Sequence, residues 1–250
     1  MGPIKQIALG LDSYRRSFGI IREHRLGRYF LLPVLINIAL MVLVWYGGSW
    51  FGDWLSAKFD TGEGFIGFLG SLMRGAIMVL AYLLFIFVGG QIVIMLMSPV
   101  YSIISEKVDK AVSGRAYDSS ASQIARDIWR SVVLTVKCTF KELAITCLLM
   151  LLNIVPLVGT VLSLVLVFVV NCYYFGYSFM DYTCERARMD ADVTSQYIFR
   201  YKYLAIAIGA VYALSLYTVL GAFVAAFIGG LSTVAATLSQ LKLDGYGNKD

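Results

Sequence analysis

The sequence predicts a helical integral membrane protein with several membrane segments. Of its 250 residues, 59% are hydrophobic and only 15% are charged, whereas globular proteins carry about 25% charged residues. Asp, Glu, Lys and Arg are absent from the long stretches 75–105, 143–180 and 203–241. Apolar runs of ~18 residues or more are typical of membrane helices, because ~20 helical residues cross the ~30 Å hydrocarbon core. The composition excludes a soluble enzyme, a disordered chain, a disulfide-rich toxin and an outer-membrane barrel.

The N-terminal segment 1–27 is predicted to form an amphipathic helix that ends at the membrane surface. Lys and Arg lie largely on one side of it, and the apolar residues recur on the other side at helical spacing: Ile4, Ile7, Ala8, Leu11, Tyr14, Phe18 and Ile21. A helix packed on the protein's own cytoplasmic loops fits the same pattern. Because basic residues precede the first apolar stretch, we expect no cleavable signal peptide.

Two long spans are expected next, at 28–54 and within 75–113, where the second span continues into a cytoplasmic extension. Lys and Arg number six in 1–28, two in the loop between the spans and seven in 106–142. Cytoplasmic segments carry the excess of Lys and Arg. The N-terminus and the central segment are therefore predicted to be cytoplasmic, in a multi-pass topology.

The run 143–180 is interrupted at Pro156 to Gly159, so that 13 residues precede the proline and 21 follow the glycine. The first arm reaches only ~20 Å at 1.5 Å per residue, which is less than a full crossing. The segment 122–180 is therefore predicted to be a helical hairpin that enters the membrane partway and returns. Its turn, 153–160, would place non-helical backbone at membrane depth, which is tolerated against protein or a water-filled cavity.

A polar stripe follows the second arm of this hairpin. Its members fall within roughly 80° at 100° per residue: Thr160, Ser163, Asn171, Tyr174 and Ser178. A lined route for a solute and contact between helices both fit such a stripe. The candidate residues of a conduit are Asn153, Pro156, Gly159, Thr160, Ser163 and Asn171.

The last apolar run, 203–241, is broken near Gly221 into arms of 18 and 20 residues. Two thin spans or a second deep hairpin both fit these lengths. Small residues repeat every fourth position in the second arm, and this pattern favours close helix packing over ligand contact: Gly221, Ala225, Gly229, Thr233 and Thr237. Two interrupted apolar runs in succession are similar to the broken helices of transport proteins.

No pattern for catalysis is visible, so we expect neither an enzyme nor a cofactor or metal site. His24 is the single histidine, and the cysteines lack metal-ligand or redox spacing. Nucleophile-elbow, zinc-protease and phosphate-loop motifs are absent. The uncharged runs hold no carboxylate for a proton relay, which argues against a proton-coupled pump. Nucleic acid is not needed to explain the pI near 9.0.

Arg25, Gly27 and Arg28 lie where the first span begins. Free backbone N–H groups and the helix dipole favour anions at a helix start, and arginine binds tetrahedral oxyanions through paired donors. Arg25 and Arg28 are therefore candidate anion-binding residues. The same two arginines would also serve as the ordinary orientation signal and anchor of a membrane helix.

Several motifs resemble the CysZ sulfate permease family, the etoposide-induced protein domain family. Arg28 to Pro33 followed by Asn37 is similar to the family's entry into its first membrane helix. Met97-Ser98-Pro99 with Glu106 resembles its proline turn after the second helix. The strongest similarity is Ile154 to Gly159 followed by Asp181-Tyr182, with a Pro-to-Asp separation of 25 residues.

The resemblance implies an all-α integral membrane fold with two long transmembrane helices, two partly inserted helical hairpins and amphipathic interfacial helices, in a single domain over 1–250. The second hairpin would be 203–241. It also implies a homo-oligomer in the bacterial inner membrane that takes up sulfate for cysteine synthesis without ATP. The family's sulfate motif, Gly-hydrophobic-Arg-Arg, has Arg28 at its second arginine, whereas Gly27 stands at the first and Arg25 lies upstream.

The sequence thus predicts an anion channel or permease whose partners are a sulfate-like inorganic anion, the lipid bilayer and further copies of the chain. The altered arginine motif and the small-residue stripe also fit a second hypothesis. In that hypothesis the protein is a non-transporting membrane scaffold or an accessory subunit of a larger envelope complex.

Overall fold

The computed structural model describes residues 1–31, 97–115, 121–155, 157–216, 218 and 221–246, together with single positions between 34 and 75. The side chains of 121–128, 131, 221–223, 225 and 226 are not among the described parts. The two predicted long spans therefore lie largely outside the described residues. Pro156 lies outside them as well.

The described part of the chain is mainly helical and contains no strand. This confirms the all-helical prediction. The chain forms α1 (Pro3–Glu23), a 3₁₀ helix η1 (Leu26–Phe30) and a helix that includes 97–113. It continues with α4 (Ala121–Met150), the 3₁₀ helix η2 (Leu151–Ile154), α5 (Val158–Arg186), α6 (Ala191–Arg200), α7 (Lys202–Leu216) and α8 (Gly221–Leu243).

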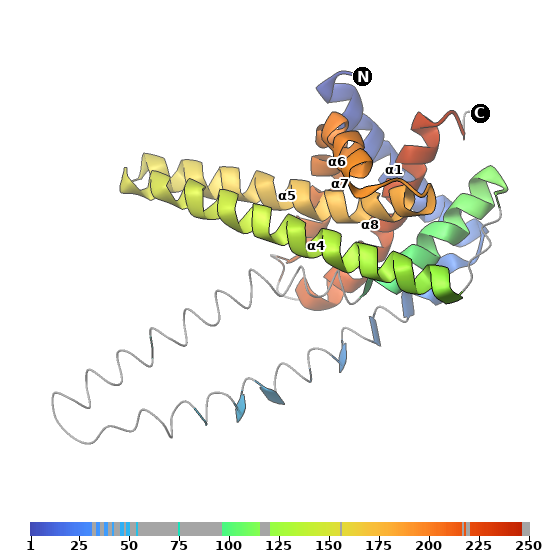
Figure 1. Cartoon of the computed structure of the whole chain (residues 1–250), viewed down its shortest axis with the longest axis horizontal. Coiled ribbons are helices and arrows are strands. Elements are labelled where there is room, and N and C mark those ends of the chain that lie inside the picture. The colour runs from blue at the N-terminus through green and yellow to red at the C-terminus, as the bar shows by residue number, and fades with distance from the viewer. Residues whose placement is uncertain are drawn as a thin grey trace.

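The helices are arranged as a cluster from which one pair projects. In Figure 1, α4 and α5 run side by side and extend away from the other labelled helices. The second half of α5 lies among α1, α6, α7, α8 and 97–113, and we call this group the helical cluster. Within it α5 packs most extensively against α7.

The centre of the helical cluster is α8. Residues 229–241 of α8 are all buried except Leu238, which is half-buried. Small side chains let the neighbours approach closely, since a Cβ at Gly229 would lie 2.2 Å from the Tyr101 hydroxyl and one at Gly230 would lie 2.6 Å from the Phe30 ring. Of the predicted small-residue stripe, Gly229, Thr233 and Thr237 are buried by packing, as that pattern favoured.

Hydrogen bonds between hydroxyl groups join α8 to its neighbours. The hydroxyls of Ser105 and Thr237 are 2.6 Å apart, and Ser239 donates to Ser13 at 2.8 Å. The Tyr14 hydroxyl donates to the Ile208 carbonyl at 2.7 Å and lies 2.6 Å from the Ser232 hydroxyl. Several hydroxyls in the interior of the cluster thus have partners there, whereas the Tyr101 hydroxyl has none among the described residues.

Helix α1 turns its polar side inward. Gln6, Ser13 and Ser17 are buried against the cluster, and Gly10 lies next to Ala207 and Leu204 of α7. The exposed side carries an apolar stripe of Ile4, Ile7, Leu11 and Phe18, which spans ~60° at 100° per residue. Lys5, Asp12 and Arg16 lie beside this stripe. Helix α1 thus packs on α7 and α8 with one side, whereas its position at a membrane surface stays a prediction.

By length and composition, α5 is the one described helix that can cross a membrane by itself. Helices α6 and α7 pass the same test only as a pair, and they are bent by 87° at Tyr201. The outer half of α5 is exposed and apolar, whereas most of its residues from Cys172 to Glu185 are buried in the helical cluster. The break in the last apolar run falls between Leu216 and Gly221, and it divides the run into helices of 15 and 23 residues.

Candidate functional site

The predicted anion-binding residues lie where α1 ends. Helix α1 stops at Glu23, and Arg25 adopts the left-handed conformation (φ 52°, ψ 36°) that turns the chain into η1. Leu26 and Phe30 are buried and fix η1 to the cluster, whereas Gly27 and Arg28 are exposed. A Cβ at Gly27 would meet no atom within 4 Å.

Neither arginine of this turn is held by a carboxylate in the described part of the chain. The Arg28 guanidinium donates to the Tyr29 hydroxyl at 3.2 Å and lies 5.0 Å from the centre of the Tyr29 ring. Arg25 is exposed to solvent. The turn therefore leaves two cationic side chains open to an anion, together with uncrowded backbone at Gly27.

The predicted conduit residues of the α4–α5 turn are joined by hydrogen bonds. The Asn153 amide donates to the Met150 carbonyl at 2.9 Å, and its Oδ1 accepts from the Ser163 hydroxyl at 3.2 Å. Gly159 is required here, because a Cβ would lie 1.8 Å from the Leu152 carbonyl oxygen. Thr160 is exposed beside it, and its carbonyl accepts from Ser163 at 3.1 Å. Asn153, Gly159, Thr160 and Ser163 thus come together at the tip, whereas Asn171 lies ~12 Å farther along α5.

Between α4 and α5 runs a line of polar side chains, which we call the polar seam: Glu142 and Thr146 of α4 with Ser163, Asn171 and Ser178 of α5. Glu142 is 3% and Thr146 is 2% exposed. The outer faces of the same helices are apolar, as Phe140 at 67% and Leu148 at 66% exposure illustrate. The Asn171 Oδ1 is enclosed and has no hydrogen-bond partner among the described residues.

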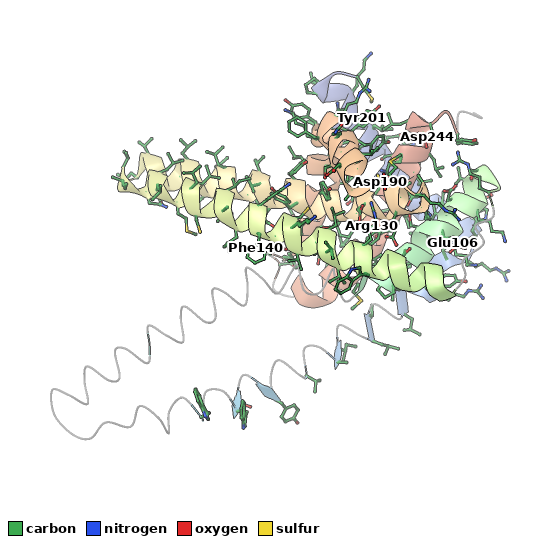
Figure 2. All side chains as sticks on the ribbon, in the orientation of Figure 1. Glu106, Arg130, Phe140, Asp190, Tyr201 and Asp244 are labelled. Atoms are coloured by element: carbon green, nitrogen blue, oxygen red, sulfur yellow. The ribbon has the colours of Figure 1, made fainter. Side chains whose placement is uncertain are left out.

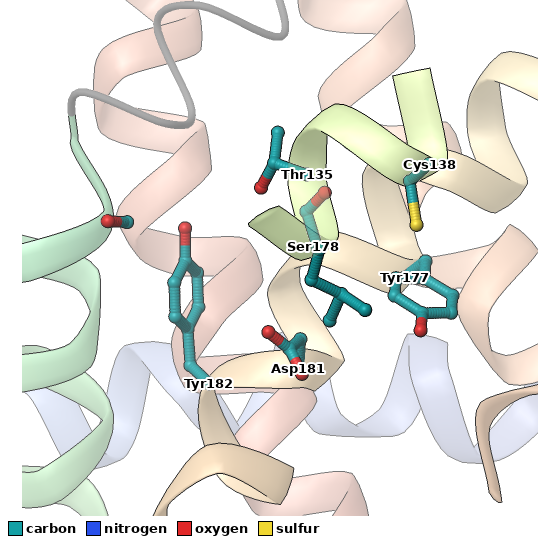
Figure 3. A pocket seen from close by; sticks show the side chains of 8 residues that line it. Thr135, Cys138, Tyr177, Ser178, Asp181 and Tyr182 are labelled. Atoms are coloured by element: carbon teal, nitrogen blue, oxygen red, sulfur yellow. The ribbon is translucent and has the colours of Figure 1, made fainter. Parts of the chain in front are cut away.

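The polar seam ends at a small cavity where the pair enters the helical cluster. Figure 3 shows Ser178, Asp181 and Tyr182 of α5 across from Thr135 and Cys138 of α4 around this space. Its volume of about 10 Å³ holds about one water molecule. A sulfate ion is larger than water, so the cavity is closed to sulfate in this conformation.

An ion pair lies beside the cavity. The Arg130 Nη2 donates to Asp181 Oδ1 at 3.2 Å and to the Thr194 hydroxyl at 2.9 Å, so that Arg130 of α4 joins α5 and α6. Figure 2 shows Arg130 where α4 lies against the cluster, whereas Phe140 lies toward the projecting part. A second buried pair joins Arg186 to Asp109, with 3.8 Å between the charged atoms and exposures of 7% and 3%. Buried charges are expensive unless paired, and both pairs meet this requirement.

Sequence reasoning did not select Arg130, Asp181 or Thr194 as site residues. The apolar run was ended at Met180 because the next residue is charged, but α5 continues to Arg186 and carries Asp181 inward. Asp181 lies three residues after Ser178, on the same side of the helix as the polar stripe. Extending that stripe by one turn would have found it. The uncharged run holds no carboxylate, but α5 continues beyond it and also contains Glu185, which is 8% exposed.

Burial changes the ionisation of groups that lie outside the apolar segments. Burial raises the pKa of the Tyr14 phenol, and its hydrogen bond to Ser232 opposes this shift. Burial also raises the pKa of Asp244, which the positive charge of Arg115 opposes. Among the described residues, no group of three or more His, Cys, Asp or Glu side chains could hold a metal ion.

The chain is similar to a known protein family and to a curated relative. The family model "Sulfate transporter CysZ/Etoposide-induced protein 2.4" matches residues 13–233, which is most of the chain. A curated protein named sulfate transporter CysZ, from Pectobacterium atrosepticum, is 24% identical over 241 residues. That alignment covers 96% of this chain and 86% of the relative. The matched range contains Arg25, Arg28, the polar seam and the Arg130–Asp181 pair.

Proposed function

Because the chain belongs to the sulfate transporter CysZ/etoposide-induced protein 2.4 family, we propose that it conducts sulfate passively across a bacterial inner membrane and so supplies cysteine synthesis. The observation that carries this proposal is the polar seam, which is enclosed between two helices whose outer faces are apolar. In hydrocarbon, polar groups turn inward toward protein or water. An anion would follow the seam without meeting lipid.

Capture of the anion is assigned to Arg25, Arg28 and the backbone at Gly27. Two guanidinium groups offer paired N–H donors, which match the oxygens of a tetrahedral oxyanion. Their exposure and the lack of a carboxylate partner in the described part of the chain support this role. These residues would raise the local concentration of sulfate at the cytoplasmic face.

The conduit is assigned to the α4–α5 pair. Asn153, Thr160 and Ser163 would form its outer end together with Pro156 and Gly159, and Asn171 would lie midway. Hydroxyl and amide groups can replace part of the water shell of an anion without binding it tightly. Such weak binding at several sites suits conduction.

We further propose that this pair is a partly inserted hairpin, that 203–241 forms a second one, and that the two long spans lie at 28–54 and within 75–113. Lys141 is exposed on α4, and only 13 residues separate it from Ile154 at the tip. This length corresponds to ~20 Å of helix, whereas the hydrocarbon core measures ~30 Å. A homo-oligomer would let several hairpins enclose one route.

Sulfate flux into proteoliposomes that contain only this protein tests the proposal. We expect radioactive sulfate to accumulate down its gradient without ATP or a proton gradient, and faster than in empty vesicles. Uptake should persist when an uncoupler removes the proton gradient, because the proposed transport is passive. Sulfate uptake no faster than in empty vesicles, with folded protein confirmed by its elution in mild detergent, would contradict it.

The same purification tests the scaffold hypothesis. If the protein is isolated in mild detergent with a foreign protein in fixed stoichiometry and gives no flux, an accessory role replaces transport. A pure homo-oligomer that transports sulfate supports the permease. A single preparation thus distinguishes the permease from the accessory subunit.

A further inference from the structure

The guanidinium of Arg130 uses only part of its hydrogen-bonding capacity. Both of its hydrogen bonds, to Asp181 and to Thr194, leave from Nη2. The Nε and Nη1 atoms are buried and have no partner among the described residues. A guanidinium carries five N–H donors, and a buried donor without an acceptor is costly. The side chain therefore keeps unused N–H donors at Nε and Nη1 inside the protein.

The guanidinium lies one residue away from the cavity at the inner end of the polar seam, because its partner Asp181 lines that cavity. Asp181 both pairs with Arg130 and lines the cavity, and the hydroxyls of Thr135 and Ser178 line it too. The surroundings thus hold the Arg130–Asp181 pair and neutral donors, and the charges of Lys141 and Glu142 also act on Cys138 in the cavity wall. A second anion would find N–H and O–H donors here, but it would also be repelled by Asp181.

We propose that Arg130 is an interior anion-binding residue and that Asp181 keeps its affinity for the anion low. This inference rests on the proposed function, which it deepens. In the conducting state the cavity widens and sulfate accepts charge-assisted hydrogen bonds from the free N–H groups of Arg130 Nη1. Repulsion from the nearby carboxylate then favours release. Conduction needs a site that binds strongly enough for entry and weakly enough for exit.

The variant Asp181→Asn tests the inference in the purified full-length protein. Removal of the carboxylate charge should lower the Kd for sulfate by about tenfold or more, because two charges a few ångströms apart interact strongly in a protein interior. Flux should saturate at a lower sulfate concentration. Asp109→Asn is the matched control, since it removes the carboxylate of the other buried pair, and its Kd should stay unchanged. Binding is measured by equilibrium dialysis with radioactive sulfate at constant ionic strength.

A purely structural ion pair predicts a different result. Asp181→Asn and Asp109→Asn would then both lower the melting temperature, and the Kd for sulfate would equal that of the wild type in each. The proposal instead expects sulfate, but not chloride at equal ionic strength, to raise the melting temperature of Asp181→Asn more than that of the wild type. Equal shifts in both proteins overturn it.

Arg130→Lys is a second variant, which keeps the charge and removes the Nε–H and Nη1–H donors. It should weaken sulfate binding by about tenfold. Should Asp181→Asn fail to fold, Arg130→Lys and Thr194→Val still decide the matter. Thr194→Val removes an acceptor of Arg130 away from the cavity and should leave the Kd near that of the wild type. If wild-type protein takes up sulfate and Arg130→Lys binds it equally well, this inference alone fails. If the wild type takes up none, the proposed function fails with it.

Discussion

At the scale of single residues, arginine side chains occur in two different environments in this protein. Arg25 and Arg28 are exposed, whereas Arg130 and Arg186 are paired with buried carboxylates. An exposed arginine keeps its water shell and exchanges it readily for an anion. A buried arginine must have partners, because the cost of an isolated buried charge is several kcal/mol in practice.

Replacing both Arg25 and Arg28 by Ala should reduce sulfate affinity by about tenfold or more, because each loss removes a charge-assisted hydrogen bond. Arg22→Ala is the matched control, since it removes an exposed positive charge from the last turn of α1. Equilibrium dialysis gives the Kd, and the yield of membrane-inserted protein shows whether anchoring persists. Equal sulfate affinity in the double variant and in the control would show that both arginines serve only to anchor the helix.

At the scale of elements, two glycines decide how closely α5 and α7 pack. A Cβ at Gly209 would lie 1.8 Å from the Cys172 carbonyl oxygen, and one at Gly176 would lie 1.8 Å from the Ala205 carbonyl oxygen. The contacts are reciprocal, since each helix places a glycine against the backbone of the other. Any side chain there would push the two helices apart.

Gly209→Ala should therefore destabilise the protein by about 1–3 kcal/mol or more through overpacking. Gly19→Ala is the matched control, because Gly19 is also helical but has nothing within 4 Å of its Cβ position. That control should be neutral or stabilising, as Ala favours a helix over Gly by ~1 kcal/mol. Melting in mild detergent measures both. The close packing of α5 and α7 at Gly176 and Gly209 would be refuted if the two variants melted at the same temperature.

At the scale of the whole molecule, buried hydroxyls occur together with many exposed large apolar side chains. Buried hydroxyls connect α1, α7, α8 and 97–113, and large apolar side chains are exposed on α1 and along α4 and α5. Exposed apolar area of this extent indicates contact with something other than water. The composition of the chain predicts that this partner is lipid.

Spin labels on α1 test this arrangement. In a Cys147→Ser background the remaining cysteines are buried, so a label at Leu11→Cys or Lys5→Cys reports one site. We expect dissolved oxygen, which concentrates in lipid, to relax the Leu11 label, and a water-soluble nickel complex to relax the Lys5 label. Strong relaxation of both labels by the nickel complex would show that the apolar stripe of α1 faces water.

Composition and periodicity were sufficient to predict helices and a membrane-compatible segment, because uncharged runs of this length have few alternatives. They could not predict which side of α1 packs against the helical cluster, since Ser13 and Ser17 are buried only by tertiary contacts. Composition does not predict the Arg130–Asp181 pair, because a charged residue ordinarily marks the end of an apolar span. In fact, Asp181 lies inside α5, and its partner on α4 is 51 residues away in the sequence.

The docking of α1 on the last helix has a consequence for biosynthesis. Ser13 bonds to Ser239 and Asp12 to Lys242, at separations of 226 and 230 residues. The ribosome thus releases the inward side of the first helix long before its partners exist. Until α8 is synthesised, those hydroxyls must be satisfied by water or by lipid headgroups, so we expect the packing of α1 to be completed only after α8 has left the ribosome. A nascent chain truncated before α8 should remain open to proteases at its N-terminus.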